Sequence, residues 1–240
     1  MAGGPPRSLN DPHADLDELL ARYEALGEER DFLAAKPLFE QALAEGEHAW
    51  LLNAYGYLLE CHGRRELRRA AELYEHAIEL DPEYDQPHYQ LISARAGLRE
   101  PQRAVAAYEA RLAAAPAAVR EHRFLAHAYL AAHEYAKALD VAEAGLALAR
   151  SDAALVSARG EAKAGLRDVE GALADWRVAL ELQPEDIGAL YSTAFLLERE
   201  GRLAESADAW QAIVDWNEAR GLTLEALWPT QELARLRATP

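Results

Sequence analysis

Three side chains suited to binding an anion lie close together within residues 120–127. Arg120 and Arg123 are three residues apart, and His127 follows Arg123 by four. Side chains at these spacings share one face of an α-helix. Because guanidinium groups bind carboxylates through charge-assisted hydrogen bonds, we expect this face to accept an acidic group. The alternative is that both arginines pair with neighbouring glutamates and keep the face soluble.

The other reactive side chains have spacings that do not favour catalysis or metal binding. Two metal ligands on one helix face need a spacing of three or four residues, whereas His122, His127 and His133 are separated by five and six. Cys61 and His62 are adjacent, so their side chains diverge on a helix. The sequence contains no glycine-rich phosphate loop, nucleophile elbow or HExxH motif. We therefore predict no catalytic residue, no metal site and no cofactor.

Composition narrows the class of protein. Of the 240 residues, 50% are hydrophobic and 28% are charged, which is typical of a globular chain. The formal net charge of −16 disfavours nucleic acid and anionic membrane surfaces as partners. No apolar run is long enough to insert into a membrane, and residues 1–12 lack the apolar core of a secretory signal. We expect a cytoplasmic protein with a disordered tail over 1–12.

An aromatic residue recurs along the chain at a constant interval. This interval equals the sequence separation between Tyr74 and Tyr108. The aromatic residue is present as Tyr74, Tyr108, Trp176 and Trp210, and Ala142 takes its place in one unit. A small residue stands four positions before each of these (Ala70, Ala104, Ala138, Ala172, Ser206), and an aliphatic one stands four positions after (Ile78, Leu112, Leu146, Leu180, Val214). This spacing predicts the buried stripe of an α-helix. Pro82, Pro116 and Pro184 then end three of these helices.

A second helix precedes the striped helix in each unit, and short turns separate the two. His133 and Gly201 mark two of these turns, and Pro101 lies in the first turn of its helix. Phe39 belongs to an earlier unit, whose second helix should be weakened by Pro37. We predict one solenoid over residues 13–218, followed by a capping segment at 219–240 in which Trp228 and Leu233 are expected to cover the exposed end. Its six helix pairs are expected at about 13–47, 48–82, 83–116, 117–150, 151–184 and 185–218.

This pattern resembles the tetratricopeptide repeat (TPR), a helix–turn–helix unit of about 34 residues that usually ends in proline. The resemblance rests on the recurring small residue, the aromatic and the proline, although Arg150 and Glu218 replace the proline in two units. It implies an all-α, right-handed α-α superhelix of about six helix pairs with a C-terminal capping helix. In the first helix of each repeat, one position is normally occupied by a small residue. In the unit at 48–82, the constant interval counted back from Tyr74 assigns Leu58 to this position. Gly56 takes that place if this repeat carries a local two-residue insertion.

The resemblance also implies a concave groove lined by the first helix of each pair. The residues expected to line it are Tyr55, Leu59, Gln86, Tyr89, Arg120, Arg123, His127, Ser157, Glu161, Tyr191 and Phe195. This lining is aromatic towards both ends and positive in the middle. The lysine and asparagine set by which carboxylate-clamp TPRs hold chaperone tails is missing, so we predict that the chain is not of that subclass.

Three functions follow from this reading, and the first is favoured. The chain is expected to be a non-enzymatic scaffold that binds a peptide or helix of another protein, with an acidic or C-terminal segment held by Arg120 and Arg123. A self-assembling structural unit, using the convex or end faces, is the alternative. An enzyme on a helical scaffold would require a pocket with convergent, strongly perturbed titratable groups. The sequence leaves the partner and the oligomeric state open.

Overall fold

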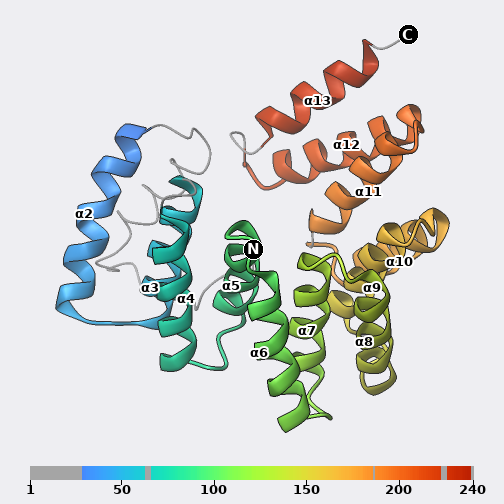
Figure 1. The fold of residues 1–240 in the computed structure, drawn as a ribbon. Helices are drawn as coiled ribbons and strands as arrows, with labels where there is room; N and C mark the ends of the chain where they lie inside the picture. The colour runs from blue at the N-terminus through green and yellow to red at the C-terminus, as the bar shows by residue number, and fades with distance from the viewer. Residues whose placement is uncertain (1–28, 63–65, 186, 223–225, 239–240) are drawn as a thin grey trace. The chain divides into compact units, whose positions relative to one another are not determined.

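The fold was analysed in a computed structural model, which describes residues 29–62, 66–185, 187–222 and 226–238. All the regular structure in these ranges is α-helical (Figure 1). The helices are α2 (Glu29–Glu45), α3 (Ala49–His62), α4 (Leu67–Leu80), α5 (Asp85–Gly97), α6 (Pro101–Ala114), α7 (Val119–Ala131), α8 (Tyr135–Leu148), α9 (Ala153–Gly165), α10 (Val169–Leu182), α11 (Ile187–Arg199), α12 (Leu203–Glu218) and α13 (Leu227–Arg237).

These helices confirm the predicted all-α class built from helix pairs. The pairs α3/α4, α5/α6, α7/α8, α9/α10 and α11/α12 coincide with five of the predicted repeats, and α2 is the second helix of the first. The expected first helix of that repeat and the expected tail at 1–12 lie outside the described residues. The chain divides into two compact units, Met1–Ala107 and Tyr108–Pro240, with the division inside α6.

The core of the first unit is formed by α2, α3 and α4. Phe39, Leu51 and Tyr74 are fully buried there. Gly56 lies against the Tyr74 ring so closely that an added Cβ would come within 2.6 Å of a ring carbon. Gly56 is therefore the small residue of this repeat, two residues earlier than the interval from Tyr74 indicates. Helix α2 continues through Pro37 without interruption.

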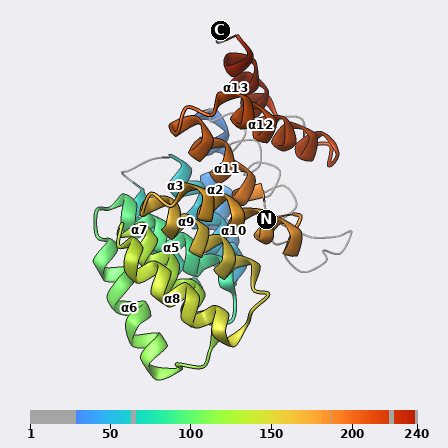
Figure 2. The same ribbon diagram turned by 90° about the vertical axis from the view of Figure 1, so that its right-hand side faces the viewer.

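In the second unit, each helix packs against the next one along the chain, from α7 to α13 (Figure 2). Phe124, Leu155, Trp176 and Trp210 are among its large buried side chains. Gly160 lies against Trp176 as Gly56 lies against Tyr74, and an added Cβ would come within 2.8 Å of the indole nitrogen. In these two helix pairs, the predicted aromatic residue thus packs against a glycine of the preceding helix.

The helix ends follow the local sequence. Helices α4, α6 and α10 each end two residues before Pro82, Pro116 or Pro184, as predicted. At the opposite ends, the carboxylate of Asp152 accepts a hydrogen bond from the backbone N–H of Leu155 and so caps α9. Asp168 caps α10 in the same way through the N–H of Gly171. Such caps are worth about 1 kcal/mol each.

The turn within four of the helix pairs repeats one strained backbone conformation. Arg99, His133, Arg167 and Gly201 have φ angles of 63°, 58°, 71° and 75°. They recur at the same interval as the aromatic residues, so the left-handed conformation is a property of the repeat. Only Gly201 adopts this conformation without a steric penalty.

Helix α13 packs against α12 at the C-terminal end of the second unit. Leu233 and Leu236 are 4% and 5% exposed and join the cluster around Trp210. The predicted capping helix is therefore present, and Leu233 is one of its buried contacts, as expected. Trp228 was expected to share that role, but its side chain stays 45% exposed.

The repeated turn yields the first testable prediction. A Cβ at Gly201 would meet no atom within 4 Å, so substitution there reports the backbone penalty alone. Gly201→Ala should lower the free energy of unfolding by about 1 kcal/mol, because alanine is disfavoured at positive φ. Gly201→Asn should lower it less, because asparagine enters this region more readily. Urea unfolding followed by circular dichroism measures both; equal stability of all three proteins would contradict the assignment.

Candidate binding surfaces

Helix α7 carries the three residues that were expected to bind an anion. Arg123 donates hydrogen bonds from Nε and Nη2 to Oδ2 of Asp152, at 2.8 and 2.5 Å. Asp152 is buried and also caps α9. The guanidinium of Arg120 lies over the ring of Phe124, 5.2 Å from its centroid, which is a cation–π contact. Arg123 thus ties α7 to the next repeat, and its partner is an aspartate rather than the glutamate considered above.

The third member of this face, His127, contributes little positive charge. Burial lowers the pKa of its imidazole to about 4, from an ordinary value of 6.5. The ring is therefore neutral at neutral pH, because the charged form would lose its hydration on helix α7. Arg120 and Arg123 are the cations of the face, and Arg123 is paired with Asp152.

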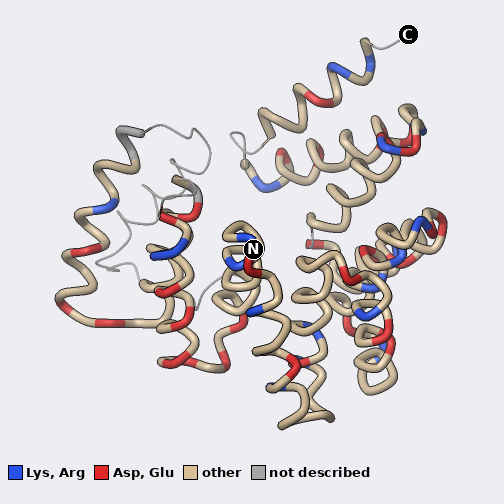
Figure 3. Tube along the Cα trace, viewed as in Figure 1, with Lys and Arg blue, Asp and Glu red and all other residues tan. Residues whose placement is uncertain are grey.

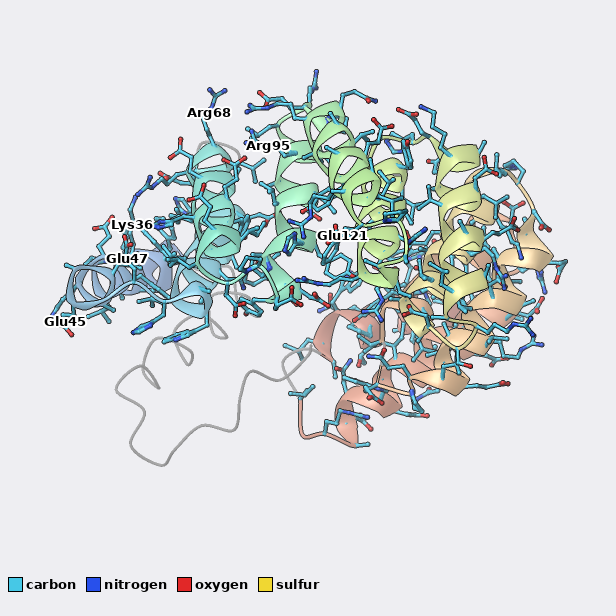
Figure 4. The ribbon with its side chains drawn as sticks, turned by 90° about the horizontal axis from the view of Figure 1, so that it is seen from below. Lys36, Glu45, Glu47, Arg68, Arg95 and Glu121 are labelled. Carbon is cyan, nitrogen blue, oxygen red and sulfur yellow. The ribbon has the colours of Figure 1, made fainter. Side chains whose placement is uncertain are left out.

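Other cations of the second unit are also bound to carboxylates of neighbouring helices. On α9, Arg159 and Lys163 both reach the buried Asp175 of α10, at 2.6 and 2.7 Å. Arg111 of α6 forms a bidentate pair with Glu121 of α7, with both donor–acceptor distances at 2.8 Å. Glu121 is labelled in Figure 4. These pairs hold the stack together and offer few free guanidinium groups to a ligand.

Helix α9 provides the next two predicted groove residues. Ser157 is half-buried, and its backbone carbonyl accepts a hydrogen bond from Nε1 of Trp176 at 3.3 Å. Glu161 is half-buried, four residues further along the same helix. Neither residue belongs to an apolar cluster, so this part of the predicted lining is polar.

In the first unit, the predicted groove residues have different surroundings. Gln86 is exposed and Tyr89 is half-buried, both on α5. Tyr55 and Leu59 are core residues, 4% and 0% exposed, because the small residue of the repeat is Gly56 rather than Leu58. The Tyr55 hydroxyl donates to Glu40 at 2.8 Å, and burial raises the pKa of this phenol.

The shifted register moves Asn53 and Tyr57 to the groove positions at which Tyr55 and Leu59 were expected. Asn53 is 7% exposed. Glu60 accepts a hydrogen bond from the Tyr74 hydroxyl at 2.9 Å, and burial raises the pKa of its carboxyl group. Nearby, Arg95 donates to Glu75 of α4, and Figure 4 shows Arg95 beside that helix. The two groove positions of this repeat are therefore a buried asparagine and a half-buried tyrosine.

Tyr191 and Phe195 of α11 are brought together with Trp228 of α13 over the buried Trp210. The Tyr191 and Trp228 rings stack with centroids 5.9 Å apart, and the Phe195 and Trp228 centroids are also 5.9 Å apart. Trp210 meets the three rings edge-on at 5.1–5.7 Å. Phe195 is 49% exposed and Trp228 is 45% exposed. We call Tyr191, Phe195 and Trp228 the aromatic face.

The stack itself does not require aromatic residues at these positions. One repeat earlier, the residues corresponding to Tyr191 and Phe195 are Ser157 and Glu161. Both of these are polar, yet the repeat folds with a buried Trp176. The aromatic residues on α11 are therefore extra apolar surface, and exposed apolar surface of this kind marks interaction sites.

Sequence reasoning found two members of the aromatic face and assigned the third to the cap. The sequence feature that could have revealed the third member is Trp228 itself, because the outer face of a capping helix is expected to be polar. A tryptophan there indicates either a buried contact or a binding role, and only the exposed fraction of the side chain distinguishes the two.

The described residues offer no sign of metal chemistry or membrane insertion. They contain no group of three or more His, Cys, Asp or Glu side chains arranged to hold a metal ion. None of the helices in the described ranges is both long enough and apolar enough to cross a bilayer.

Comparison with solved structures finds TPR proteins. A thermophilic TPR protein from Thermus thermophilus, TTC0263, superposes with a TM-score of 0.61 at 20% identity, over 78% of this chain and 98% of that one. A TPR protein from Parabacteroides merdae gives a TM-score of 0.49 at 13% identity, over 93% and 94% of the two chains. YrrB, described as a TPR protein with an unusual peptide-binding site, gives 0.45 at 20% identity, over 78% and 96%. No protein-family model matches the sequence, and no curated protein is significantly similar to it.

The lowered pKa of His127 predicts a pH-dependent stability. The unfolded chain binds a proton at His127 below about pH 6.5 and the folded chain only below about pH 4, so stability is lost as the pH falls through this window. Between pH 7 and pH 5, this group should remove about 1–2 kcal/mol from the free energy of unfolding. The His127→Gln variant should not show this loss of stability between pH 7 and pH 5. The His133→Gln variant, which changes an exposed residue, should still show it. Urea unfolding at both pH values measures the difference, and parallel losses in the wild type and His127→Gln would contradict the shift.

Proposed function

From the tetratricopeptide repeat fold that the chain shares with the Thermus protein, we propose that it is a non-enzymatic interaction module for another protein. TPR folds generally mediate protein–protein interactions. The observation that carries the proposal is the aromatic face, on which Phe195 and Trp228 expose about half of their side chains. The bound element is a peptide or helix of the partner, anchored by a large apolar side chain.

The aromatic face has the properties of an interaction hot spot. Tryptophan, tyrosine and arginine dominate the binding energy of protein interfaces. The rings are fixed by contacts with Trp210, which is fully buried, so they lose little conformational freedom when a partner docks. Burial of a large apolar side chain against them would contribute about 1.5–3 kcal/mol.

Recognition of an acidic or C-terminal group by α7 remains part of the proposal, but it now depends mainly on Arg120. Arg123 is bound to Asp152, so Arg123→Glu would place two carboxylates together and destabilise the stack. Arg120 is the better position to test. If an acidic group of the partner binds here, Arg120→Glu should weaken partner binding at a smaller cost in stability than Arg123→Glu, because it breaks a cation–π contact rather than a pair with a buried carboxylate.

A self-assembling role is the second candidate, because α13 also exposes Leu227 by 52% next to Trp228. Two copies could cover these side chains by contacting each other. Light scattering after size-exclusion chromatography would show a molar mass that rises with concentration and falls to that of a monomer in Trp228→Ser. A concentration-independent monomer would contradict self-assembly.

The proposed function predicts that peptides selected on this protein need the aromatic face. Peptides from a random phage-displayed library should be enriched in large apolar residues. By isothermal titration calorimetry, Phe195→Ser and Trp228→Ser should each weaken a selected peptide at least tenfold, because each removes a large part of the contact surface.

The control is Leu148→Ser, which removes an equally exposed side chain (52%) from α8. It should leave the affinity unchanged. Unchanged affinity in the Phe195→Ser, Trp228→Ser double variant would contradict the assignment of the site. Failure to enrich any peptide would contradict the proposed function as a whole.

A further inference from the structure

The helices α10, α11 and α12 border an open pocket of about 380 Å³. Its lining residues come from α10, from α11, which contributes Thr193, and from α12 with the turn before it, and none of them belongs to the aromatic face. We call this the three-helix pocket.

The interior of the three-helix pocket is apolar. Leu173 and Leu180 contribute from α10, and Leu190 and Leu197 contribute from α11. The volume is at the lower end of the range for ligand pockets, about 300–1,000 Å³. It suits one bulky side chain of a partner better than a cofactor.

The rim of the pocket is charged, with an excess of carboxylates. Glu170, Glu205 and Asp208 face two guanidinium groups, those of Arg177 and Arg202. Arg202 donates to Glu170 at 2.7 Å and to Glu205 at 2.7 Å, so one cation serves two carboxylates. The side chain of Glu170 is still 79% exposed. The rim therefore attracts a further positive charge.

From the apolar interior and the acidic rim together, we infer that the three-helix pocket docks a segment of a partner protein that carries a leucine or phenylalanine flanked by lysine or arginine. The apolar side chain fills the space between the leucines. The basic side chain pairs with Glu170 or Asp208 at the rim. This docking does not depend on the aromatic face and would use a different part of the partner, or a different partner.

Three capped helical peptides in an alanine–glutamine host can test this inference. The first has a central leucine with lysines four residues before and after it, the second has glutamates in place of the lysines, and the third has alanine in place of the leucine. Each is titrated into protein with ¹³C-labelled leucine methyl groups. The lysine peptide should shift the methyl signals of Leu173, Leu190 and Leu197. The glutamate and alanine peptides should bind at least tenfold more weakly.

Variants of the protein separate the interior from the rim. Thr193→Phe should fill the pocket and abolish the shifts, and Glu170→Gln combined with Asp208→Asn should weaken the lysine peptide at least threefold. Glu181→Gln, an exposed residue of α10 outside the lining, is the matched control and should bind normally. Binding that survives Thr193→Phe, or equal binding of the lysine and glutamate peptides, would overturn the inference.

Two further outcomes distinguish this inference from binding at the aromatic face and from docking of a second copy of the chain. The Phe195→Ser, Trp228→Ser double variant should bind the lysine peptide as the wild type does; loss of binding there would move the peptide to the aromatic face and overturn the pocket assignment. Self-association that is lost in Thr193→Phe would show a second copy as the occupant and would overturn the choice of a foreign partner.

Discussion

The contact between an aromatic ring and a small residue of the preceding helix sets the geometry on which the rest of the structure depends. At Gly160, an added Cβ would come within 2.8 Å of Nε1 of Trp176, so the two helices lie as close as an indole ring allows. One repeat later, Ala194 takes the place of Gly160, and Trp210 has a buried Nε1 with no acceptor among the described residues. Trp176, by contrast, donates to the carbonyl of Ser157. The repeat with glycine at this position thus has the indole hydrogen bond, and the repeat with alanine lacks it.

Charge in this chain is organised by the same stacking. The positive side chains lie among acidic ones along the helices (Figure 3). Arg123 binds Asp152, and Arg159 and Lys163 share Asp175, each carboxylate being buried. Removal of Arg123 would leave the buried carboxylate of Asp152 without its cation, and the loss of one partner from such a buried pair costs about 3–5 kcal/mol. The arginines therefore act mainly as ties between helices, and the excess negative charge of the chain faces outward.

The constant interval between the aromatic residues was enough to predict the helix pairs, the prolines that end them and the turn at Gly201, because these depend on local sequence. It did not determine the register of the repeat at 48–82, where Gly56 contacts Tyr74 two residues earlier than the interval indicates. The role of Arg123 depends on Asp152, which is 29 residues away and reaches it only through stacking. The three-helix pocket could not be predicted, because its leucines follow the same helical spacing as core leucines.

Helix α11 presents two chemically different surfaces, and its geometry keeps them apart. With about 100° per residue, the pair Tyr191 and Phe195 is centred roughly 150° around the helix axis from the trio Leu190, Thr193 and Leu197. One side carries the exposed rings, and the other forms the wall of the three-helix pocket. If both proposed sites bind, a ligand on one side of α11 leaves the other side open, because the two sets of side chains point in nearly opposite directions.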